Sequence, residues 1–238
     1  MKFNNKFRLI ITQNFSSKIN SNIDKALFKA FDNDSLAILR VYSWEDSISF
    51  GAGQNIDDYS FLVNKYKNNV SKRLTGGGVL FHGHDISYTI LLNPNIIENR
   101  DVKETYFLLC QFILKFYENL GLKASFAKDN QNIILSKSPF CQVGFEAYDI
   151  IIDGKKIGGN AQKRAKVCIL QHGSIPLFKK ENSEYFGSSL DDFGINLSFE
   201  EAKNRLIKAF RESFNVEFIE DDLSNKEKDI LEKLNNEN

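Results

Sequence analysis

The chain has 238 residues, with 31 basic and 31 acidic side chains and a formal net charge of zero. Apolar residues make up 42% and charged residues 26%, which is typical of a soluble protein with a sizeable core and no need of a structural metal. The charge is balanced along the chain, so nucleic acid is not an expected partner. No apolar run reaches the ~18 residues of a membrane span.

The cysteines indicate a reducing compartment. There are three, Cys110, Cys141 and Cys168, and their spacing is irregular. An odd, irregular set is typical of free thiols in a cytoplasmic protein. Residues 1–17 are basic but lack the continuous apolar stretch of a signal peptide. We therefore expect a cytoplasmic protein that does not associate with membranes.

The first half of the chain mixes helical and strand-like patterns. Apolar spacing predicts helices and strands, with helices over residues 22–31, 57–66 and 102–120, and strands over 36–42, 47–50 and on both sides of the turn at 83–85. The helix over 102–120 is expected to be the longest and to end at Gly121.

The second half begins with strand-like segments and ends in helices. Strands are expected over residues 133–135, 148–152, 155–157, 167–177 and 216–219, and helices over 198–214 and 224–234. The pair Asp153-Gly154 predicts a hairpin turn. No repeat or flexible linker occurs, so we expect a single catalytic domain over residues 1–238, of which 220–238 form a helical tail. The mixture of helices and antiparallel hairpins favours the α+β class.

A glycine-rich segment follows the second predicted helix, Lys72-Arg73-Leu74-Thr75-Gly76-Gly77-Gly78-Val79-Leu80-Phe81-His82. Three glycines in a row allow backbone N–H groups to approach a ligand closely. Arg73 supplies a cation that suits a carboxylate or a phosphate. The segment matches neither the phosphate-loop nor the dinucleotide-binding pattern. Taken alone, it also fits a tight strand connection with a solvated Lys-Arg pair.

A second segment combines Lys156, two glycines and, further on, a histidine: Lys156-Ile157-Gly158-Gly159-Asn160-Ala161, then His172-Gly173-Ser174. A lysine beside glycines can reach into a site, although most lysines simply lie on the surface. No metal site is expected, because the chain has only three histidines and lacks any motif that gathers three or four ligands.

The three cysteines differ in their surroundings. Cys110 lies on the apolar face of a predicted helix, and Cys168 lies in a predicted core strand. Cys141 follows a loop-like stretch, where partial exposure and a nearby positive charge would make a thiol reactive. The residues alone leave open whether Cys141 is a nucleophile or inert.

The two segments, in this order and about 80 residues apart, resemble the lipoate–protein ligase and octanoyltransferase family, to which the biotin ligases are more distantly related. The family pattern R-R-x-x-G-G-G-x-x-x-H appears as Lys72 to His82, K-[VI]-x-G-[SN]-A as Lys156 to Ala161, and H-G-[ST] as His172 to Ser174. The resemblance covers about residues 20–220 and implies a curved mixed β-sheet flanked by helices.

The resemblance also implies which residues form the site. Lys156 would be the essential lysine that hydrogen-bonds the acyl carbonyl. The substrate-binding residues would be Arg73, Thr75, Gly76, Gly77, Gly78, His82, Gly159, Asn160, Ala161 and His172.

Cys141 distinguishes the branches of the family. The pattern Cys-x6-Tyr-[ED], here Cys141 to Tyr148-Asp149, is similar to the cysteine-dependent octanoyltransferases and lipoyl amidotransferases, although those often have Pro-Ser where this chain has Phe145-Glu146. Cys141 would then be the nucleophile. Another transferase branch carries its cysteine near the H-G motif, which makes Cys168 the second candidate.

The resemblance therefore implies an acyltransferase. An octanoyl or lipoyl group would pass from acyl carrier protein, or another lipoylated or octanoylated carrier, through a Cys141 thioester to a lysine of a lipoyl domain or glycine-cleavage H protein, with no cofactor. The alternative is an ATP-dependent lipoate–protein ligase that forms lipoyl-adenylate with ATP and Mg²⁺. A protein that only captures lipoate or acyl carrier protein remains a third hypothesis.

Overall fold

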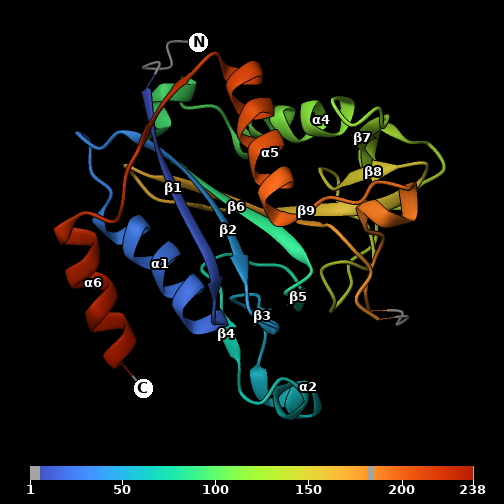
Figure 1. Ribbon diagram of the computed structural model, residues 1–238, viewed down its shortest axis with the longest axis horizontal. Coiled ribbons are helices and arrows are strands. Elements are labelled where there is room, and N and C mark those ends of the chain that lie inside the picture. The colour runs from blue at the N-terminus through green and yellow to red at the C-terminus, as the bar shows by residue number, and fades with distance from the viewer. Residues whose placement is uncertain (1–5, 182–184, 238) are drawn as a thin grey trace.

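An eight-stranded mixed β-sheet organises the fold in the computed structural model, which describes residues 6–181 and 185–237 (Figure 1). The strands, in spatial order, are β11 (Glu217–Glu220), β1 (Lys6–Phe15), β2 (Ala37–Trp44), β6 (Asp85–Leu92), β10 (Ile169–Pro176), β9 (Lys155–Arg164), β8 (Ile150–Ile152) and β7 (Ala124–Phe126). β1 pairs in parallel with β2 and β11, and the other pairs are antiparallel. This is the expected α+β architecture.

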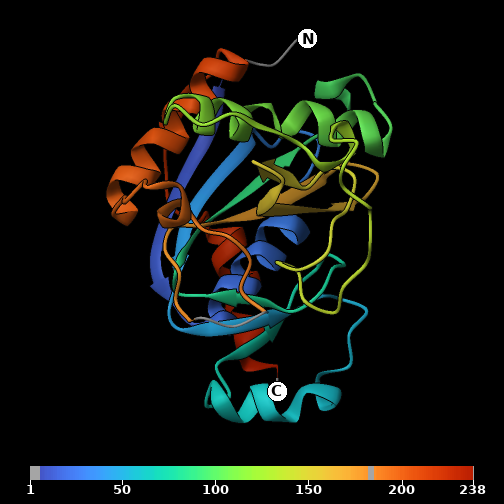
Figure 2. The same ribbon diagram turned by 90° about the vertical axis from the view of Figure 1, so that its right-hand side faces the viewer.

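A second, smaller sheet lies beside the first. Its strands are β4 (Val70–Lys72), β3 (Ser47–Phe50) and β5 (Leu80–His82). The connection between β7 and β8, yellow-green in Figure 2, runs down from the large sheet toward this small sheet. It meets the segment before β5 where Val79 pairs with Phe140. The two sheets and this connection enclose the cavity described below.

Helices cover both faces of the large sheet. The α-helices are α1 (Ser17–Ala30), α2 (Ser60–Lys65), α3 (Val102–Leu109), α4 (Gln111–Glu118), α5 (Phe199–Phe214) and α6 (Asn225–Asn236). Short 3-10 turns occupy η1 (Ile56–Tyr59), η2 (Pro94–Ile97), η3 (Ala127–Asp129) and η4 (Leu190–Phe193). α1 and α6 lie on one side of the sheet, and α4 and α5 lie on the other (Figure 1).

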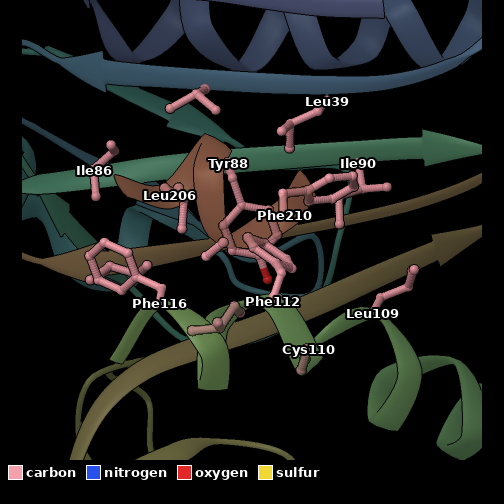
Figure 3. Close-up of a cluster of buried hydrophobic side chains, with 14 of the residues drawn as sticks. Leu39, Ile86, Tyr88, Ile90, Leu109, Cys110, Phe112, Phe116, Leu206 and Phe210 are labelled. Atoms are coloured by element: carbon pink, nitrogen blue, oxygen red, sulfur yellow. The ribbon is translucent and has the colours of Figure 1, made fainter. Parts of the chain in front are cut away.

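Successive side chains of a strand point to opposite faces of the sheet, and this alternation gives the large sheet one hydrophobic core on each face. Leu39 of β2 and Ile90 of β6 point toward α4 and α5, where they join the cluster of Phe112 and Phe210 shown in Figure 3. Their neighbours Ile38 and Leu91 point to the opposite side and pack with residues of α1. Both strands are therefore apolar throughout most of their length, and the sheet is buried on both faces.

Two sequence expectations were wrong. The helix expected over 102–120 is two helices, α3 and α4, separated by a turn at Cys110 (φ −83°, ψ −5°). Leu109 and Phe112 both face the core, as residues three apart would in an unbroken helix, and α5, with 16 residues, is longer than either α3 or α4. The strand expected over 133–135 is an open loop in which Ile134 is 86% exposed. Strands β1, β4 and β7 were not predicted.

The C-terminal helix was predicted, and it is anchored to the body of the fold. Arg8 donates to Glu227 of α6 at 2.8 Å, and the amide of Asn22 donates to the carbonyl oxygen of Leu234 at 3.2 Å. Ser224 and Glu227 form a capping box at the helix start. Residues 225–236 thus form part of the layer that includes α1.

Candidate active site

A cavity of about 250 Å³ opens where the two sheets meet the β7–β8 connection. Its floor comes from β2, β6, β9 and β10, and its walls come from the glycine segment and the β7–β8 connection. Eleven of the twelve residues expected in the site line it: Arg73, Gly76, Gly77, Gly78, His82, Cys141, Lys156, Gly159, Asn160, Ala161 and His172. Thr75 lies just behind the wall, and Cys168 is outside.

The glycine segment is fastened directly to the segment that carries Cys141. The Val79 amide donates to the Pro139 carbonyl oxygen at 2.8 Å, and the Cys141 amide donates to the Val79 carbonyl oxygen at 2.7 Å. This approach requires a glycine at 78, since a Cβ there would lie 2.4 Å from the Pro139 oxygen. The glycines therefore hold the thiol at the cavity wall.

Replacing Gly78 by alanine is expected to lower the free energy of unfolding by about 1–3 kcal/mol, the usual cost of overpacking. The added methyl group would meet the backbone of Pro139 and of Cys141, at 2.4 and 2.9 Å. Gly53→Ala is the matched control, because nothing lies within 4 Å of the new Cβ. Urea denaturation of both variants tests this, and equal stabilities would contradict the close packing.

Arg73 links the glycine segment to strand β3 through hydrogen bonds. One terminal nitrogen donates to the carbonyl oxygen and hydroxyl of Ser49, at 2.6 and 2.7 Å, and the other donates to the Gly78 carbonyl oxygen at 2.7 Å. The side chain lies beside the thiol, because a Cβ on Gly77 would be 3.6 Å from Arg73 Nη2 and 3.8 Å from Cys141 Sγ. Arg73 thus orders the glycine segment and places a cation near Cys141.

Lys156 reaches the cavity because of a β-bulge. Ile151 pairs with Lys156, but Ile150 pairs with Gly158, so one extra residue is inserted in β9. In a regular strand, residues 156 and 159 would face opposite sides. Here a Cβ on Gly159 would be 3.7 Å from both Lys156 Cε and Cys141 Sγ. The amine and the thiol therefore flank the same small space.

An aspartate accompanies the lysine. Asp149 Oδ2 lies 2.5 Å from Lys156 Nζ, and the ammonium also donates to the Gly144 carbonyl oxygen at 3.3 Å. Burial raises the pKa of Asp149, and the attraction of Lys156 only partly offsets this. The pair is therefore a fixed, water-poor unit beside the thiol.

His172 supports the glycine segment from the large sheet. Its Nε2 lies 2.6 Å from the Thr75 hydroxyl oxygen, and its Nδ1 lies 3.4 Å from Asp24 Oδ2. Asp24 in turn accepts from the buried Arg40 at 2.7 Å. Burial raises the pKa of Asp24, but Arg40 and His172 together lower it below its ordinary value. Thr75 and His172 therefore tie the loop to the sheet.

The second motif packs as a pair of strands. Asn160 lies opposite Gly173, and Ala161 lies opposite His172. A Cβ on Gly173 would be 2.5 Å from Asn160 Oδ1, so this position admits only glycine. Asn160 accepts a hydrogen bond from the Tyr88 hydroxyl, which fixes its amide at the cavity floor.

His82 forms part of the wall. Its ring stacks on Trp44 with centroids 3.8 Å apart, Nδ1 lies 3.1 Å from Asp85 Oδ2, and Nε2 lies 2.7 Å from the Ser49 hydroxyl oxygen. Burial lowers the pKa of His82. Both ring nitrogens have hydrogen-bond partners within the protein, so His82 would contact a ligand by van der Waals packing of its ring.

Asp85 is expected to make stability depend on pH in acid. Burial raises its pKa, but His82, His84 and the Ser174 hydroxyl together lower it more, to about 2 from 3.8. Because the ionised Asp85 carboxylate is favoured in the folded state, it stabilises the fold above pH ~4, and this stabilisation is lost as the carboxylate is protonated while the pH falls through about 2. This contribution is about 2–3 kcal/mol. Unfolding free energies between pH 5 and pH 2 should therefore fall less steeply for Asp85→Asn than for the parent, and parallel slopes would contradict this assignment.

Cys168 has no access to this cavity. It is 1% exposed among the apolar residues between the sheet and α1, and burial raises its pKa to about 12. Cys110 is equally buried on the other face, with its pKa raised to about 12. Of the three thiols, Cys141 is the one that lines the cavity.

Several lining residues had no role in the sequence analysis, chiefly Tyr42, Trp44, Tyr106, Glu146 and Gln162. Asp149 was present in the Cys-x6-Tyr-[ED] pattern, but the pattern did not disclose its contact with Lys156. Trp44 is the only tryptophan of the chain, and this rarity was the sole feature of the sequence that could have marked it as a site residue.

Within residues 6–181 and 185–237, no group of three or more His, Cys, Asp or Glu side chains is placed to hold a metal ion. None of the helices in these ranges has the length and apolar character of a membrane span.

Comparison with known proteins identifies the family. The model of the lipoyl protein ligase A/B catalytic domain matches residues 17–190, so the chain belongs to this family of enzymes. Octanoyltransferase LipM of Clostridioides difficile is 26% identical over 257 residues, covering 97% of this chain and 95% of the relative. Octanoyltransferase LipM of Lysinibacillus sphaericus is 32% identical over 207 residues, with coverages of 80% and 70%.

A solved structure has the same fold. The protein Ta0514 of T. acidophilum, a putative lipoate protein ligase with bound lipoic acid, superimposes with a TM-score of 0.80. It is 22% identical and covers 98% of this chain and 95% of its own. The family and the curved mixed sheet expected from the sequence are therefore confirmed.

Proposed function

We propose that this enzyme transfers an octanoyl group, or the related lipoyl group, from a carrier-protein thioester to a lysine side chain by way of Cys141. One observation carries the proposal: Cys141 and Lys156 meet at Gly159 on the wall of a cavity of about 250 Å³. The similarity to proteins named octanoyltransferase supports the acyl group.

In the first step, Cys141 attacks the carbonyl carbon of the donor thioester. The bond from that carbon to the carrier sulfur breaks, and the carrier leaves as a thiol with the proton that Cys141 has lost. The negative charge on the carbonyl oxygen is greatest in the tetrahedral intermediate. Lys156, held beside Cys141, donates a hydrogen bond to this oxygen. The product is an acyl-Cys141 thioester.

In the second step, the neutral amine of an acceptor lysine attacks the acyl-Cys141 carbonyl carbon. The C–N bond forms, the C–S bond breaks, and one amine proton is transferred so that Cys141 becomes a thiol again. Conversion of a thioester to an amide is downhill, so we propose that neither ATP nor Mg²⁺ takes part. The same lysine serves both steps.

The cavity also suits an aliphatic chain. Tyr42, Trp44, Tyr106, Phe140 and Val143 supply apolar surface around the polar centre. Each buried CH₂ contributes about 0.8 kcal/mol, so an eight-carbon chain gains several kcal/mol from the cavity. These aromatic walls favour a medium-length acyl group over acetyl.

We propose that the donor is acyl carrier protein or another acylated carrier, and that the acceptor is a lipoyl domain or the glycine-cleavage H protein. A free thiol nucleophile suits a reducing compartment, and we propose the cytoplasm as the place of the reaction.

The test compares two acyl sources. Octanoyl-acyl carrier protein without nucleotide should label a purified lipoyl domain by the mass of one octanoyl group. Octanoate or lipoate with Mg-ATP should not. Labelling only in the second mixture would instead establish an ATP-dependent ligase, and labelling in neither would favour a protein that merely binds an acyl group.

A further inference from the structure

We propose that Asp149 is a positioning residue for this transfer, which keeps Lys156 as an ammonium and aims one of its N–H groups at the carbonyl oxygen of the thioester. The inference rests on the proposed function and adds a third residue to the pair of Cys141 and Lys156. Asp149 also lines the cavity, and its Oδ1 would lie 3.5 Å from a Cβ on Gly159, but the role proposed for it is exerted through Lys156.

The hydrogen bonds of Lys156 leave one donor for the substrate. An ammonium group has three N–H donors. Asp149 lies 2.5 Å from Lys156 Nζ and takes one, and the Gly144 carbonyl oxygen at 3.3 Å takes another. Lys156 lines the cavity, and no third acceptor is bonded to it among the residues that the structure describes. The remaining N–H therefore belongs to the space that it shares with Cys141.

Asp149 is itself held rigidly. Its Oδ2 accepts from the Glu146 amide at 2.7 Å, and its own amide donates to the Glu146 carbonyl oxygen at 3.1 Å. Its carbonyl oxygen accepts from the Ala127 amide at 2.9 Å, which joins it to η3, directly after β7. Asp149 and Gly144 lie in the same connection as Cys141, so Lys156 is bound at two points to the segment that carries the nucleophile.

Because Lys156 and Asp149 are both buried, the Lys156 ammonium depends on the Asp149 carboxylate as its counter-charge. The Lys156 and Asp149 side chains are only 9% and 6% exposed. A buried ammonium is costly without a counter-charge. Burial raises the pKa of Asp149, and Lys156 is the largest influence that lowers it. The other titratable or charged groups facing this pair are Cys141, Glu146, Tyr106 and, beyond Gly77, Arg73. Glu146 is exposed, and neither an ion pair nor a hydrogen bond joins its carboxylate to Lys156 among the residues that the structure describes.

The test uses Asp149→Asn, which preserves shape and removes the charge. Acylation of Cys141 by octanoyl-acyl carrier protein and aminolysis by a lipoyl domain are each followed from pH 6 to pH 10 by single-turnover mass spectrometry. We expect both rate constants at pH 7 to fall at least tenfold, with KM for the carrier within about twofold of the parent. The decline at alkaline pH should begin at a lower pH than in the parent, because the unpaired ammonium loses its proton more readily.

Asp153→Asn is the matched control, because Asp153 lies exposed in the turn between β8 and β9 and the charge change is the same. We expect it to retain the parental rates and pH profile. A uniform loss of rate in Asp149→Asn with a parental pH profile would overturn the proposal, since it would indicate a merely structural role. Parental rates would also overturn it.

A second variant covers the case in which Asp149→Asn fails to fold. Asp149→Glu keeps the charge but moves it by one methylene. A parental onset of the alkaline decline with a lowered kcat would support the proposal, and a parental kcat would overturn it. Failure of the parent enzyme itself to form an acyl adduct would refute the proposed function, which is a separate result.

Discussion

Replacing Cys141 by alanine is expected to abolish octanoyl transfer, with a loss of at least about 10³-fold, since removing the nucleophile of a covalent mechanism removes the whole pathway. Cys141 is partly exposed at the cavity wall, with the Arg73 guanidinium on its Gly77 side and the Lys156–Asp149 ion pair on its Gly159 side. The measurement is the rate at which a lipoyl domain gains one octanoyl group from octanoyl-acyl carrier protein. Because the variant removes only a sulfur atom at the edge of a cavity, its thermal unfolding should remain close to that of the parent.

The two other cysteines provide the control for this result. Cys168→Ala and Cys110→Ala remove thiols of similar chemistry that are buried in the two cores. Each variant is expected to lose about 1 kcal/mol of stability and to retain its transfer rate. Transfer that survives in Cys141→Ala and disappears in Cys168→Ala would contradict the assignment of the nucleophile.

Replacing Lys156 by methionine is expected to slow both steps by about 10²–10³-fold, which corresponds to about 2.7–4 kcal/mol for one lost donor to an oxyanion. Methionine has a similar length but cannot donate a hydrogen bond, so the tetrahedral intermediates lose the N–H that Lys156 provides. The rate constants for acylation and for aminolysis should fall together, because the same donor serves both. Pre-steady-state mass spectrometry separates the two constants.

Lys155→Met is the matched control for Lys156. Lys155 is the neighbouring residue in β9, but it is exposed, does not line the cavity and extends over the ring of Phe193. Its replacement should leave both rate constants unchanged. A parental acylation rate in Lys156→Met would contradict the role of Lys156 as the donor to the oxyanion.

The motifs predicted most of the residues that line the candidate cavity, because their residue types are tied to backbone geometry. The glycines at 77 and 78 were recognisable, and the structure shows why they are needed: a positive φ at Gly77 and the close approach of Pro139 at Gly78. The partner of Arg73 was not predictable, because the guanidinium binds the carbonyl oxygens of Ser49 and Gly78. Carbonyl oxygens leave no signature in a sequence.

The contact between Asp149 and Lys156 depends on features that hydrophobic patterns do not reveal. The contact requires the β-bulge in β9. A bulge is one extra residue in one of two paired strands, so it can be recognised only when the pairing of the strands is known. The same limit explains the helix break at Cys110 and the open loop at Ile134, where the apolar spacing continues although the backbone does not follow it. Local pattern therefore predicted most elements, and tertiary contacts decided the rest.

Intact-protein mass spectrometry of the enzyme with octanoyl-acyl carrier protein, without ATP, is the most direct test of the proposed mechanism. The mechanism predicts a gain of one octanoyl group that hydroxylamine removes, that maps to the peptide containing Cys141 and that disappears when a lipoyl domain is added. The absence of any adduct, together with labelling of the lipoyl domain only when lipoate and Mg-ATP are supplied, would contradict it.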